Sequence, residues 1–302
     1  MEKLFQPRQL LCLGFGYTAR AFYHYLQKYN IRIIASYRTK DKQEFDNNQN
    51  LVPFQFDFNS NEKIPEKLLE DVDSILISIP PTDEGDLVIS KHREWLLKIS
   101  SRVKWIGYLS ATSVYGDWQG KWVDEKSNLL AQTERGKRRI KAEKSWMDLW
   151  QNFNLPIHIF RLAGIYGPGR NVLEDLVAQK ARHIIKPGQV FNRIYIDDLI
   201  KILSLSLAYP TPGKIYNICD DLPCFNEDIL NFATNLLTCS YPLTTDLNDP
   251  NLTPMIKSFY VDNKRISNHK MKVEFGVQLD QPTYKQGLIT LYNTNKNYFS
   301  KH

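Results

Sequence analysis

The turn that follows the first apolar run constrains the fold of this chain more than any other feature. Residues 10–13 read Leu-Leu-Cys-Leu and lead into Gly14, Gly16 and Ala19, at the spacing Gly-x-Gly-x-x-Ala. A buried strand, such a turn and a helix form the phosphate-binding unit of dinucleotide-binding folds. Gly14 would permit the tight turn, Gly16 would let backbone amides approach a pyrophosphate, and Ala19 would allow close helix–strand packing. The N–H groups at the helix N-terminus would then face the phosphates.

Short apolar runs alternate with helical periodicity through the rest of the N-terminal half. These runs are apolar throughout, which is typical of strands buried on both faces of a parallel sheet. Short βα repeats predict a doubly wound α/β fold, Rossmann-like, with right-handed crossovers. We expect strands at residues 31–37, 51–56, 74–79, 103–110 and 157–162, and helices at 18–28, 62–69, 86–100 and 135–151.

Beyond residue 168 the pattern changes to shorter mixed pieces. We therefore expect an NAD(P)-binding domain over residues 1–168 and a smaller mixed α/β substrate lobe over 169–302, with segments of the second half available to complete the sheet. Ligands of such folds bind at the carboxyl ends of the strands, where this lobe would lie. The expected pieces are helices at 171–182, 197–208 and 226–237, strands at 191–195 and 214–218, and a loop at 241–254.

The composition argues against several classes of protein. Hydrophobic residues make up 42% and charged residues 24%, which describes an ordinary globular chain. No apolar run approaches the roughly 18–20 residues of a membrane span, and the N-terminus lacks the apolar core of a secretory signal. We expect a cytoplasmic protein without a membrane partner. Its cysteines form no Cys-x-x-Cys pair and no histidine has a partner at metal-ligand spacing, so reduced thiols and no metal are expected; the cysteines are Cys12, Cys219, Cys224 and Cys239.

A basic helix is predicted over residues 135–151. The chain carries a net charge of +6, and its densest basic cluster lies at residues 135–144. A solvated helix face explains the cluster most simply, and a role toward a cofactor or substrate is the alternative. Binding of nucleic acid is not expected, because no recognised nucleic-acid module accompanies the cluster. Trp146 and Trp150 on the same helix fit either packing on the sheet or contact with a second copy in a homodimer.

Five segments, taken in order, resemble the extended short-chain dehydrogenase/reductases, also called the NAD-dependent epimerase/dehydratase superfamily. Together they cover most of the chain at plausible spacing. The resemblance implies a dinucleotide-binding fold, a small-molecule substrate and frequent dimerisation. The segments are Gly14-x-Gly16, Leu-Ser-Ala-Thr-Ser-Val-Tyr-Gly at 109–116, Arg-Leu-Ala-Gly-Ile-Tyr-Gly-Pro-Gly at 161–169, Arg-Ile-Tyr-Ile-Asp-Asp-Leu at 193–199 and Tyr-Asn-Ile-Cys-Asp-Asp-Leu-Pro at 216–223.

The catalytic motif of this superfamily is altered in the chain. Members usually carry a hydroxyl residue three positions before the valine of Val-Tyr-Gly, and Tyr-x-x-x-Lys at the start of the next helix. Here these positions hold Ala111, Arg135 and Arg139. An arginine has no acceptor atom and stays protonated, so it cannot replace the tyrosine as general acid/base. The resemblance is therefore to atypical members, which keep the fold without the usual Ser-Tyr-Lys site.

Other residues could supply the missing chemistry. Tyr115 is a substitute proton donor, although in the superfamily it mostly shapes the loop. Thr112 and Ser113 could supply the missing hydroxyl, as could Ser110 if the alignment shifts by one residue. The two arginines that replace the tyrosine and the lysine could bind an anionic substrate or a cofactor phosphate, or they could belong to the solvated helix face.

The resemblance also implies a set of cofactor contacts. The strand ending near Arg38 carries no acid for a ribose 2′-hydroxyl, so Arg38, with Lys40 nearby, favours NADP over NAD by pairing a 2′-phosphate. Asp57 could contact the adenine or cap its own loop, and Pro80 could lie beside the adenosine or stiffen its loop. The predicted cofactor residues are Gly14, Gly16, Tyr17, Thr18, Arg38, Asp57 and Pro80.

Two functions remain open at this point. The first is an NAD(P)-binding oxidoreductase or epimerase-like enzyme that acts on a small molecule, nucleotide-linked molecules included. The second is a non-catalytic protein that senses a dinucleotide or acts as a scaffold. Turnover of a substrate panel would separate the two.

Overall fold

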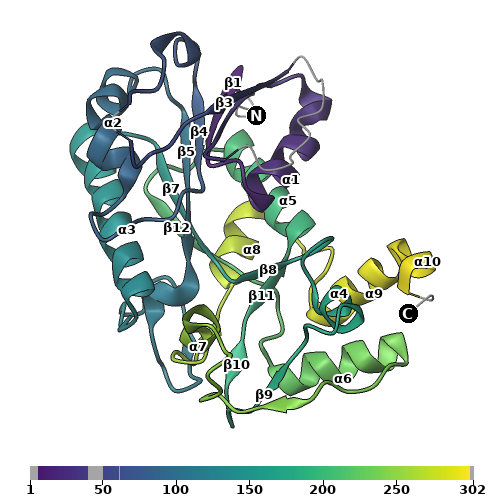
Figure 1. The fold of residues 1–302 in the computed structure, drawn as a ribbon. Helices are drawn as coiled ribbons and strands as arrows, with labels where there is room; N and C mark the ends of the chain where they lie inside the picture. Colours follow the sequence, from purple (N-terminus) through teal and green to yellow (C-terminus); the bar gives the residue numbers. More distant parts are fainter. Residues whose placement is uncertain (1–5, 40–49, 61, 300–302) are drawn as a thin grey trace. The chain divides into compact units, whose positions relative to one another are not determined.

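The computed structural model describes residues 6–39, 50–60 and 62–299, and the chain divides into two compact units (Figure 1). Each unit takes three stretches of chain. The domains expected over residues 1–168 and 169–302 stay a prediction. Unit one consists of Met1–Ala111, Lys137–Arg161 and Ile200–Tyr216, and unit two of Thr112–Gly136, Leu162–Leu199 and Asn217–His302.

Seven strands in the described residues form one central sheet, in the order β12-β7-β5-β4-β1-β2-β3. The pairs β1–β2, β1–β4, β2–β3 and β4–β5 are parallel, with Leu11 opposite both Ile34 and Ile75. The predicted doubly wound, Rossmann-like fold is confirmed. The strands are β1 (Gln9–Leu13), β2 (Arg32–Tyr37), β3 (Leu51–Gln55), β4 (Ser74–Ile77), β5 (Trp105–Ala111), β7 (Ile157–Leu162) and β12 (Lys214–Ile218).

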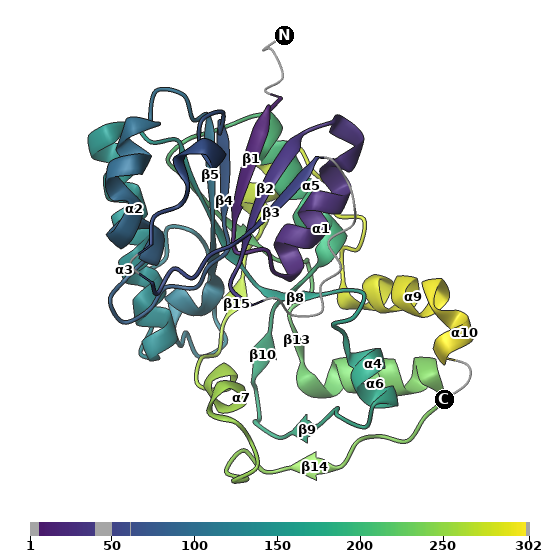
Figure 2. The same ribbon diagram turned by 45° about the horizontal axis from the view of Figure 1, so that its top comes forward.

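Helices cover both faces of this sheet (Figures 1 and 2). The helices α2 and α3 lie on one face, and α1 and α5 lie on the other. None of the helices in the described part of the chain is long and apolar enough to cross a membrane. The helix bounds are α1 (Tyr17–Leu26, continued by the 3-10 turn Gln27–Tyr29), α2 (Leu87–Lys98), α3 (Glu134–Phe153) and α5 (Ile196–Ala208).

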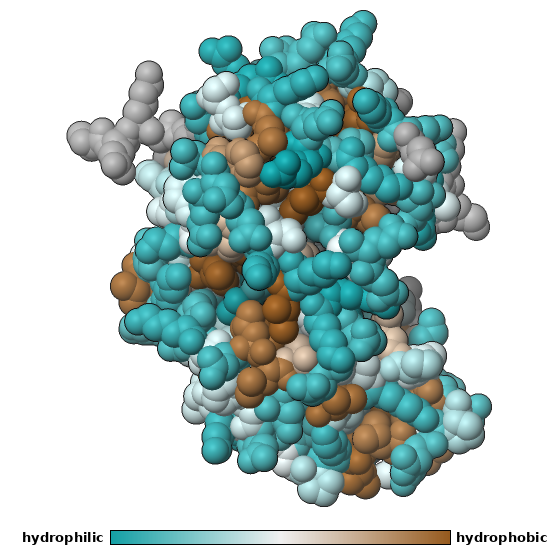
Figure 3. Space-filling view, turned by 90° about the vertical axis from the view of Figure 1, so that its left-hand side faces the viewer, coloured by the Kyte–Doolittle hydropathy of each residue, from teal (hydrophilic) through white to brown (hydrophobic). Residues whose placement is uncertain are grey.

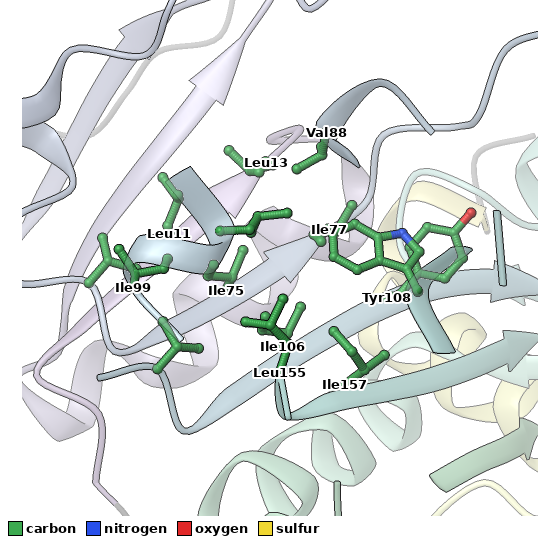
Figure 4. Packing of buried hydrophobic residues seen from close by; sticks show 14 of the residues in the cluster. Leu11, Leu13, Ile75, Ile77, Val88, Ile99, Ile106, Tyr108, Leu155 and Ile157 are labelled. Carbon is green, nitrogen blue, oxygen red and sulfur yellow. The ribbon is translucent and has the colours of Figure 1, made fainter. Parts of the chain in front are cut away.

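The apolar core of unit one lies between the sheet and the helices α2 and α3 (Figure 4). Leu11, Ile75 and Ile106 point from neighbouring strands into it and are completely buried. Every residue of β1 and β4 is buried, as expected for central strands. The strand β3, at the edge of the sheet, has one buried residue, Leu51, and otherwise half-buried and exposed positions.

A buried carboxylate joins α2 to α3. Asp86 caps α2, because its Oδ1 accepts hydrogen bonds from the N–H groups of Val88 and Ile89. Its Oδ2 accepts from Trp146 Nε1 on α3 at 3.0 Å. Trp146 is fully buried within unit one. Its side chain therefore packs on the sheet and does not face a second copy. The face that carries α2 and α3 is mainly hydrophilic with separate apolar patches (Figure 3), and a homodimer stays a prediction.

Three expectations from the sequence were wrong in detail. The helix expected at 62–69 is a single 3-10 turn, Glu66–Leu68, because Pro65 disfavours helical backbone in the residue before it. The helix expected at 171–182 ends at Val177, and Gln179 soon after adopts φ 55°. The strand expected at 191–195 is interrupted at Asn192, whose side chain bonds backbone groups of the segment 264–266 instead.

Unit two is built from short strand pairs and helices. The strand β8 (Gly164–Tyr166) runs parallel to β11 (Arg193–Tyr195), and β10 (Val190–Phe191) runs antiparallel to β13 (Cys224–Phe225). The strands β14 (Thr244–Thr245) and β15 (Arg265–Ile266) pair in parallel with β9 (His183–Ile184) and β6 (Trp122–Val123). The helices are α4 (Val172–Val177), α6 (Asn226–Leu237), α7 (Pro254–Phe259), α8 (His269–Phe275), α9 (Tyr284–Thr294) and α10 (Lys296–Phe299).

A buried ion pair ties α3 to two strands of the sheet. Arg161 on β7 donates from Nη2 to Glu143 Oε2 at 2.7 Å and from Nε to both carboxylate oxygens. Ser110 on β5 donates to Glu143 Oε1 at 2.5 Å. All three residues are at least 96% buried. Each carboxylate oxygen is thus satisfied, which is the condition under which a buried ion pair is tolerated.

We predict that Glu143→Gln lowers the free energy of unfolding by about 3–5 kcal/mol, because Arg161 keeps its charge and loses its buried counter-ion. Urea unfolding measures the change. The matched control is Glu94→Gln, which removes an exposed carboxylate on α2 and is expected to change stability by less than about 0.5 kcal/mol. Equal stability of the two variants would contradict a structural ion pair.

A second prediction concerns acid stability. His158 on β7 is completely buried, its Nε2 accepts a hydrogen bond from Thr211 N–H, and burial lowers the pKa of its imidazole to about 4. The unfolded chain protonates this histidine near pH 6.5, before the folded chain does. Stability should therefore be fully present above pH 6.5 and fall by about 3 kcal/mol between pH 6.5 and pH 4.

The variant His158→Gln keeps an acceptor for Thr211 but does not titrate. Its free energy of unfolding should fall less steeply across this interval than that of the unaltered chain. His269→Gln, at an exposed position, is the control and should keep the full slope. Identical slopes for all three proteins would show that His158 does not carry the effect.

Candidate functional site

The turn between β1 and α1 approaches the ends of two neighbouring strands. Gly14 has φ +91°, and a Cβ on it would lie 2.9 Å from Ser78 Oγ and 3.1 Å from Ile79 Cγ1, beyond β4. The N–H of Gly14 donates to Ser36 Oγ at 2.9 Å, and the N–H of Phe15 donates to the Ser36 carbonyl at 2.8 Å. Both conformation and space therefore require glycine at position 14.

Gly16 has no such requirement from the protein. Its backbone is extended (φ −87°, ψ −163°), and nothing lies within 4 Å of a Cβ built on it. It is the N-cap of α1, and no side chain caps the helix. The open space beside the helix N-terminus is where a bound anion would accept from backbone N–H groups. A ligand that approaches this backbone closely explains the missing side chain.

A cavity of about 410 Å³ opens over this turn, entirely within unit one. It is formed by the residues after β1, β2, β3 and β4, at the carboxyl ends of parallel strands, where α/β folds bind ligands. Its volume lies within the roughly 300–1,000 Å³ of small-molecule sites. Five of the predicted cofactor residues line it: Gly14, Gly16, Arg38, Asp57 and Pro80. Tyr17 and Thr18 begin α1 and do not line it, and Lys40 lies outside the described residues.

Arg38 and Asp57 bring opposite charges to the cavity lining. Arg38 is exposed just after β2, and its guanidinium forms no ion pair with the part of the chain that is described. Asp57 is half-buried, and its Oδ1 accepts from both the N–H and the Nδ2 of Asn59. Asp57 thus stabilises its own turn, one of its two expected roles, and also presents a carboxylate to the cavity. Pro80 is exposed, after the end of β4.

The predicted catalytic hydroxyls lie in unit two, on the 3-10 turn Thr112–Tyr115. Tyr115 is completely buried, and its hydroxyl donates to Asn217 Oδ1 at 2.6 Å. This geometry does not favour Tyr115 as a proton donor to a substrate, because its hydroxyl proton is already in a hydrogen bond to the buried side-chain amide of Asn217. Ser113 is 7% exposed, and its Oγ has no hydrogen-bond partner in the described residues. Thr112 is half-buried.

The two arginines at the positions expected for the usual tyrosine and lysine have different surroundings. Arg139 is half-buried in unit one, and its Nη1 donates to the Leu109 carbonyl at 2.7 Å, near the end of β5. Burial raises the pKa of the neighbouring Tyr108 hydroxyl, and the Arg139 charge opposes that rise. Arg135 is exposed in unit two, with its guanidinium carbon 4.5 Å from the centroid of the Phe259 ring. Arg139 thus fixes the end of a strand, while Arg135 remains accessible to an anion.

Sequence reasoning missed two serines that hold the cofactor turn in place. Ser36 accepts from Gly14 N–H, and Ser78 donates to the Gly14 carbonyl. Ser36 is the last but one residue of β2, and Ser78 directly follows β4. Both therefore lie at the edge of the sheet where a ligand is expected. A search for hydroxyl residues at strand ends would have found them.

The sequence relatives of the chain match only part of it. No protein-family model matches. The Escherichia coli (strain K12) "Protein YeeZ" is 31% identical over 161 residues, which are 50% of this chain and 54% of that protein. A dTDP-D-glucose 4,6-dehydratase of Bos taurus is 27% identical over 145 residues, 45% of this chain and 40% of that enzyme. The chain thus spans about half the length of the curated relatives it matches.

Solved structures match nearly the whole chain. A functionally unknown conserved protein from Silicibacter pomeroyi DSS is 40% identical, with a TM-score of 0.86 over 95% of this chain and 98% of that one. A dTDP-glucose 4,6-dehydratase from Bacillus anthracis str. Ames, solved in complex with NAD, is 17% identical, with a TM-score of 0.76 over 97% and 98% of the two chains. In sequence the chain is similar to NAD-dependent epimerase/dehydratase proteins, and it has their fold. The resemblance drawn from five sequence motifs is thereby confirmed.

The two glycines of the β1–α1 turn should respond differently to an added methyl group. Gly14→Ala should lower the free energy of unfolding by about 1–3 kcal/mol, because the new Cβ meets Ser78 and Ile79 and φ stays positive. Gly16→Ala should change it by less than about 1 kcal/mol, since its Cβ enters open space. Thermal unfolding of both variants measures the difference, and equal destabilisation would contradict the geometry.

Proposed function

We propose that the chain binds NADP(H) in the cavity over the β1–α1 turn and acts as an oxidoreductase or epimerase-like enzyme on a small molecule, nucleotide-linked molecules included. Gly16 is the observation that carries the proposal. Its position is open to any residue as far as the protein is concerned, yet it faces the cavity at an uncapped helix N-terminus. The four free cysteines fit the cytoplasmic location expected for such an enzyme.

The residues around the cavity suit the parts of a dinucleotide. The N-terminus of α1 beside Gly16 would hold the pyrophosphate. Asp57 and Pro80, which line the same cavity, would lie at the adenosine. The nicotinamide ring would supply hydride transfer, and the protein would supply binding and orientation.

Arg38 supports a preference for NADP over NAD. The position after the second strand holds an acid in enzymes that bind the ribose 2′-hydroxyl of NAD, and an arginine accommodates the 2′-phosphate of NADP. Here an exposed arginine lines the cavity at this position. The dehydratase from Bacillus anthracis was solved in complex with NAD, so the proposed preference for NADP rests on Arg38 of this chain.

Proton transfer on the substrate must differ from that of the usual Ser-Tyr-Lys site. At the aligned positions, Ala111 has no donor and both arginines lack an acceptor. Arg135, which is exposed, would bind an anionic group of the substrate. Ser113, two residues after Ala111, would be the donor or acceptor, because its buried hydroxyl has no hydrogen-bond partner in the described residues.

A non-catalytic sensor or scaffold is the second candidate. It is favoured because three polar side chains near the altered motif already donate hydrogen bonds within the protein. Tyr115 donates to Asn217, Ser110 donates to Glu143, and Arg139 donates to the Leu109 carbonyl. A protein that only reports cofactor occupancy needs no free proton donor. Binding of NADPH without any oxidation or reduction across a panel of sugar nucleotides and aldehydes would support this second function.

Titration with NADPH and NADH, followed by nicotinamide fluorescence, tests the proposal. NADPH should bind more tightly. Arg38→Gln should weaken NADPH binding by about 10–100-fold, because charge-assisted hydrogen bonds contribute about 1.5–3 kcal/mol, and should leave NADH binding nearly unchanged. Arg32→Gln removes an exposed charge from the opposite end of β2 and serves as the control, with no expected effect.

The outcomes separate cofactor binding from cofactor choice. An equal loss of NADPH and NADH binding in Arg38→Gln would contradict the 2′-phosphate assignment. Failure of both nucleotides to bind the unaltered chain at sub-millimolar concentration would overturn the proposed function itself.

A further inference from the structure

A second cavity, of about 230 Å³, lies entirely within unit two. Its lining comes from β8, β11, α4, α6, α9 and the segment 180–182, and α4 packs beside α6 there (Figure 2). Because every lining residue belongs to this unit, the cavity is complete without the cofactor site. Its volume is somewhat below the roughly 300–1,000 Å³ of sites for drug-sized ligands, so it suits a smaller molecule.

The lining of this cavity combines positive charge with an apolar wall. Lys180, Arg182 and Arg193 contribute three positive charges, and Asp175 contributes one negative charge. Apolar side chains of α6 and α9 form part of the remaining surface; they are Ile229, Leu230 and Leu288, all buried. A cavity of this kind suits an anionic group attached to a small organic body.

Arg193 is the most buried of the three cations and is only partly satisfied. It is half-buried, and its guanidinium makes one hydrogen bond within the described chain, from Nη1 to Cys224 Sγ at 3.1 Å. A guanidinium has five N–H donors, and a thiol is a weak acceptor. The remaining donors match the paired oxygens of a carboxylate or a phosphate.

Two neighbouring buried groups are also without partners. Tyr166 lines the cavity at 6% exposure, and its hydroxyl makes no hydrogen bond within the described residues; the same is true of Asp220 Oδ2, at 2% exposure. Burial raises the pKa of Asp220 to about 8, against the opposing charge of Arg193. The Asp220 N–H donates to the Arg193 carbonyl, so these two residues are adjoining. Buried polar groups are normally paired, and the unsatisfied N–H donors of Arg193 in the cavity lining point to an absent ligand.

We propose that this cavity of unit two binds a small organic anion, whose carboxylate or phosphate pairs with Arg193 and Arg182 and whose organic body lies against the apolar wall formed by α6 and α9. Carboxylates and phosphates share the paired oxygens that a guanidinium recognises. The site is independent of the proposed NADP cavity, since all its residues belong to unit two.

Three probes with related bodies test the proposal by calorimetric titration of the full chain: glycerol 3-phosphate, glycerate and glycerol. At least one of the anions should bind with a millimolar or lower dissociation constant, and glycerol should not. The better anion tells phosphate from carboxylate. Arg182→Gln should weaken that binding by about 3–10-fold and Arg193→Gln by about 10-fold or more, as expected for lost charge-assisted hydrogen bonds.

Lys285→Gln is the matched control, because it removes an exposed positive charge on α9 that does not line the cavity. It should leave binding unchanged. Arg182 is exposed, so its variant remains informative if Arg193→Gln fails to fold. The proposal is overturned if no anion binds, if glycerol binds equally well, or if the control variant loses as much affinity as Arg182→Gln. NADPH titration of Arg182→Gln should match the unaltered chain, which keeps this test separate from that of the proposed function.

Discussion

The close contact between the β1–α1 turn and the ends of β2 and β4 is the constraint on which the rest of unit one depends. Gly14 and Phe15 donate to Ser36, and a side chain at position 14 would strike Ser78 and Ile79. This contact fixes where α1 begins and leaves its N-cap, Gly16, in the cavity lining. The same packing that closes the core therefore also shapes the site.

The two glycines of the turn illustrate how a fold requirement can be separated from a ligand requirement. Gly14 is needed by the protein, because both its φ and its neighbours exclude a side chain. Gly16 is not, and its open surroundings leave room for a ligand beside the helix N-terminus. The sequence motif treats the two alike, and only the structure distinguishes them.

The fold was predictable from the sequence where apolar runs are continuous. The strands β1 and β4 are buried at every residue, and their runs in the sequence predicted that directly. Five predicted cofactor residues share one cavity because the ends of parallel strands meet at one edge. The helix expected before residue 70 failed because one proline outweighed a plausible periodicity. The networks around Glu143 and Asp86 join residues far apart in the chain, and periodicity carries no information about such pairs.

Arg139, at a position where the sequence comparison expects the lysine of the usual motif, has a role in the fold. It donates to the Leu109 carbonyl and so stabilises the end of β5. Under the proposed function, proton transfer relies on other groups, and the cofactor would carry the redox step.

A crystal structure of the chain grown with NADPH would test the central claim most directly. The account predicts one dinucleotide in the cavity, with its pyrophosphate at the N-terminus of α1 beside Gly16 and its 2′-phosphate on the Arg38 guanidinium. Density for the nucleotide elsewhere, or an empty cavity at saturating NADPH, would contradict it.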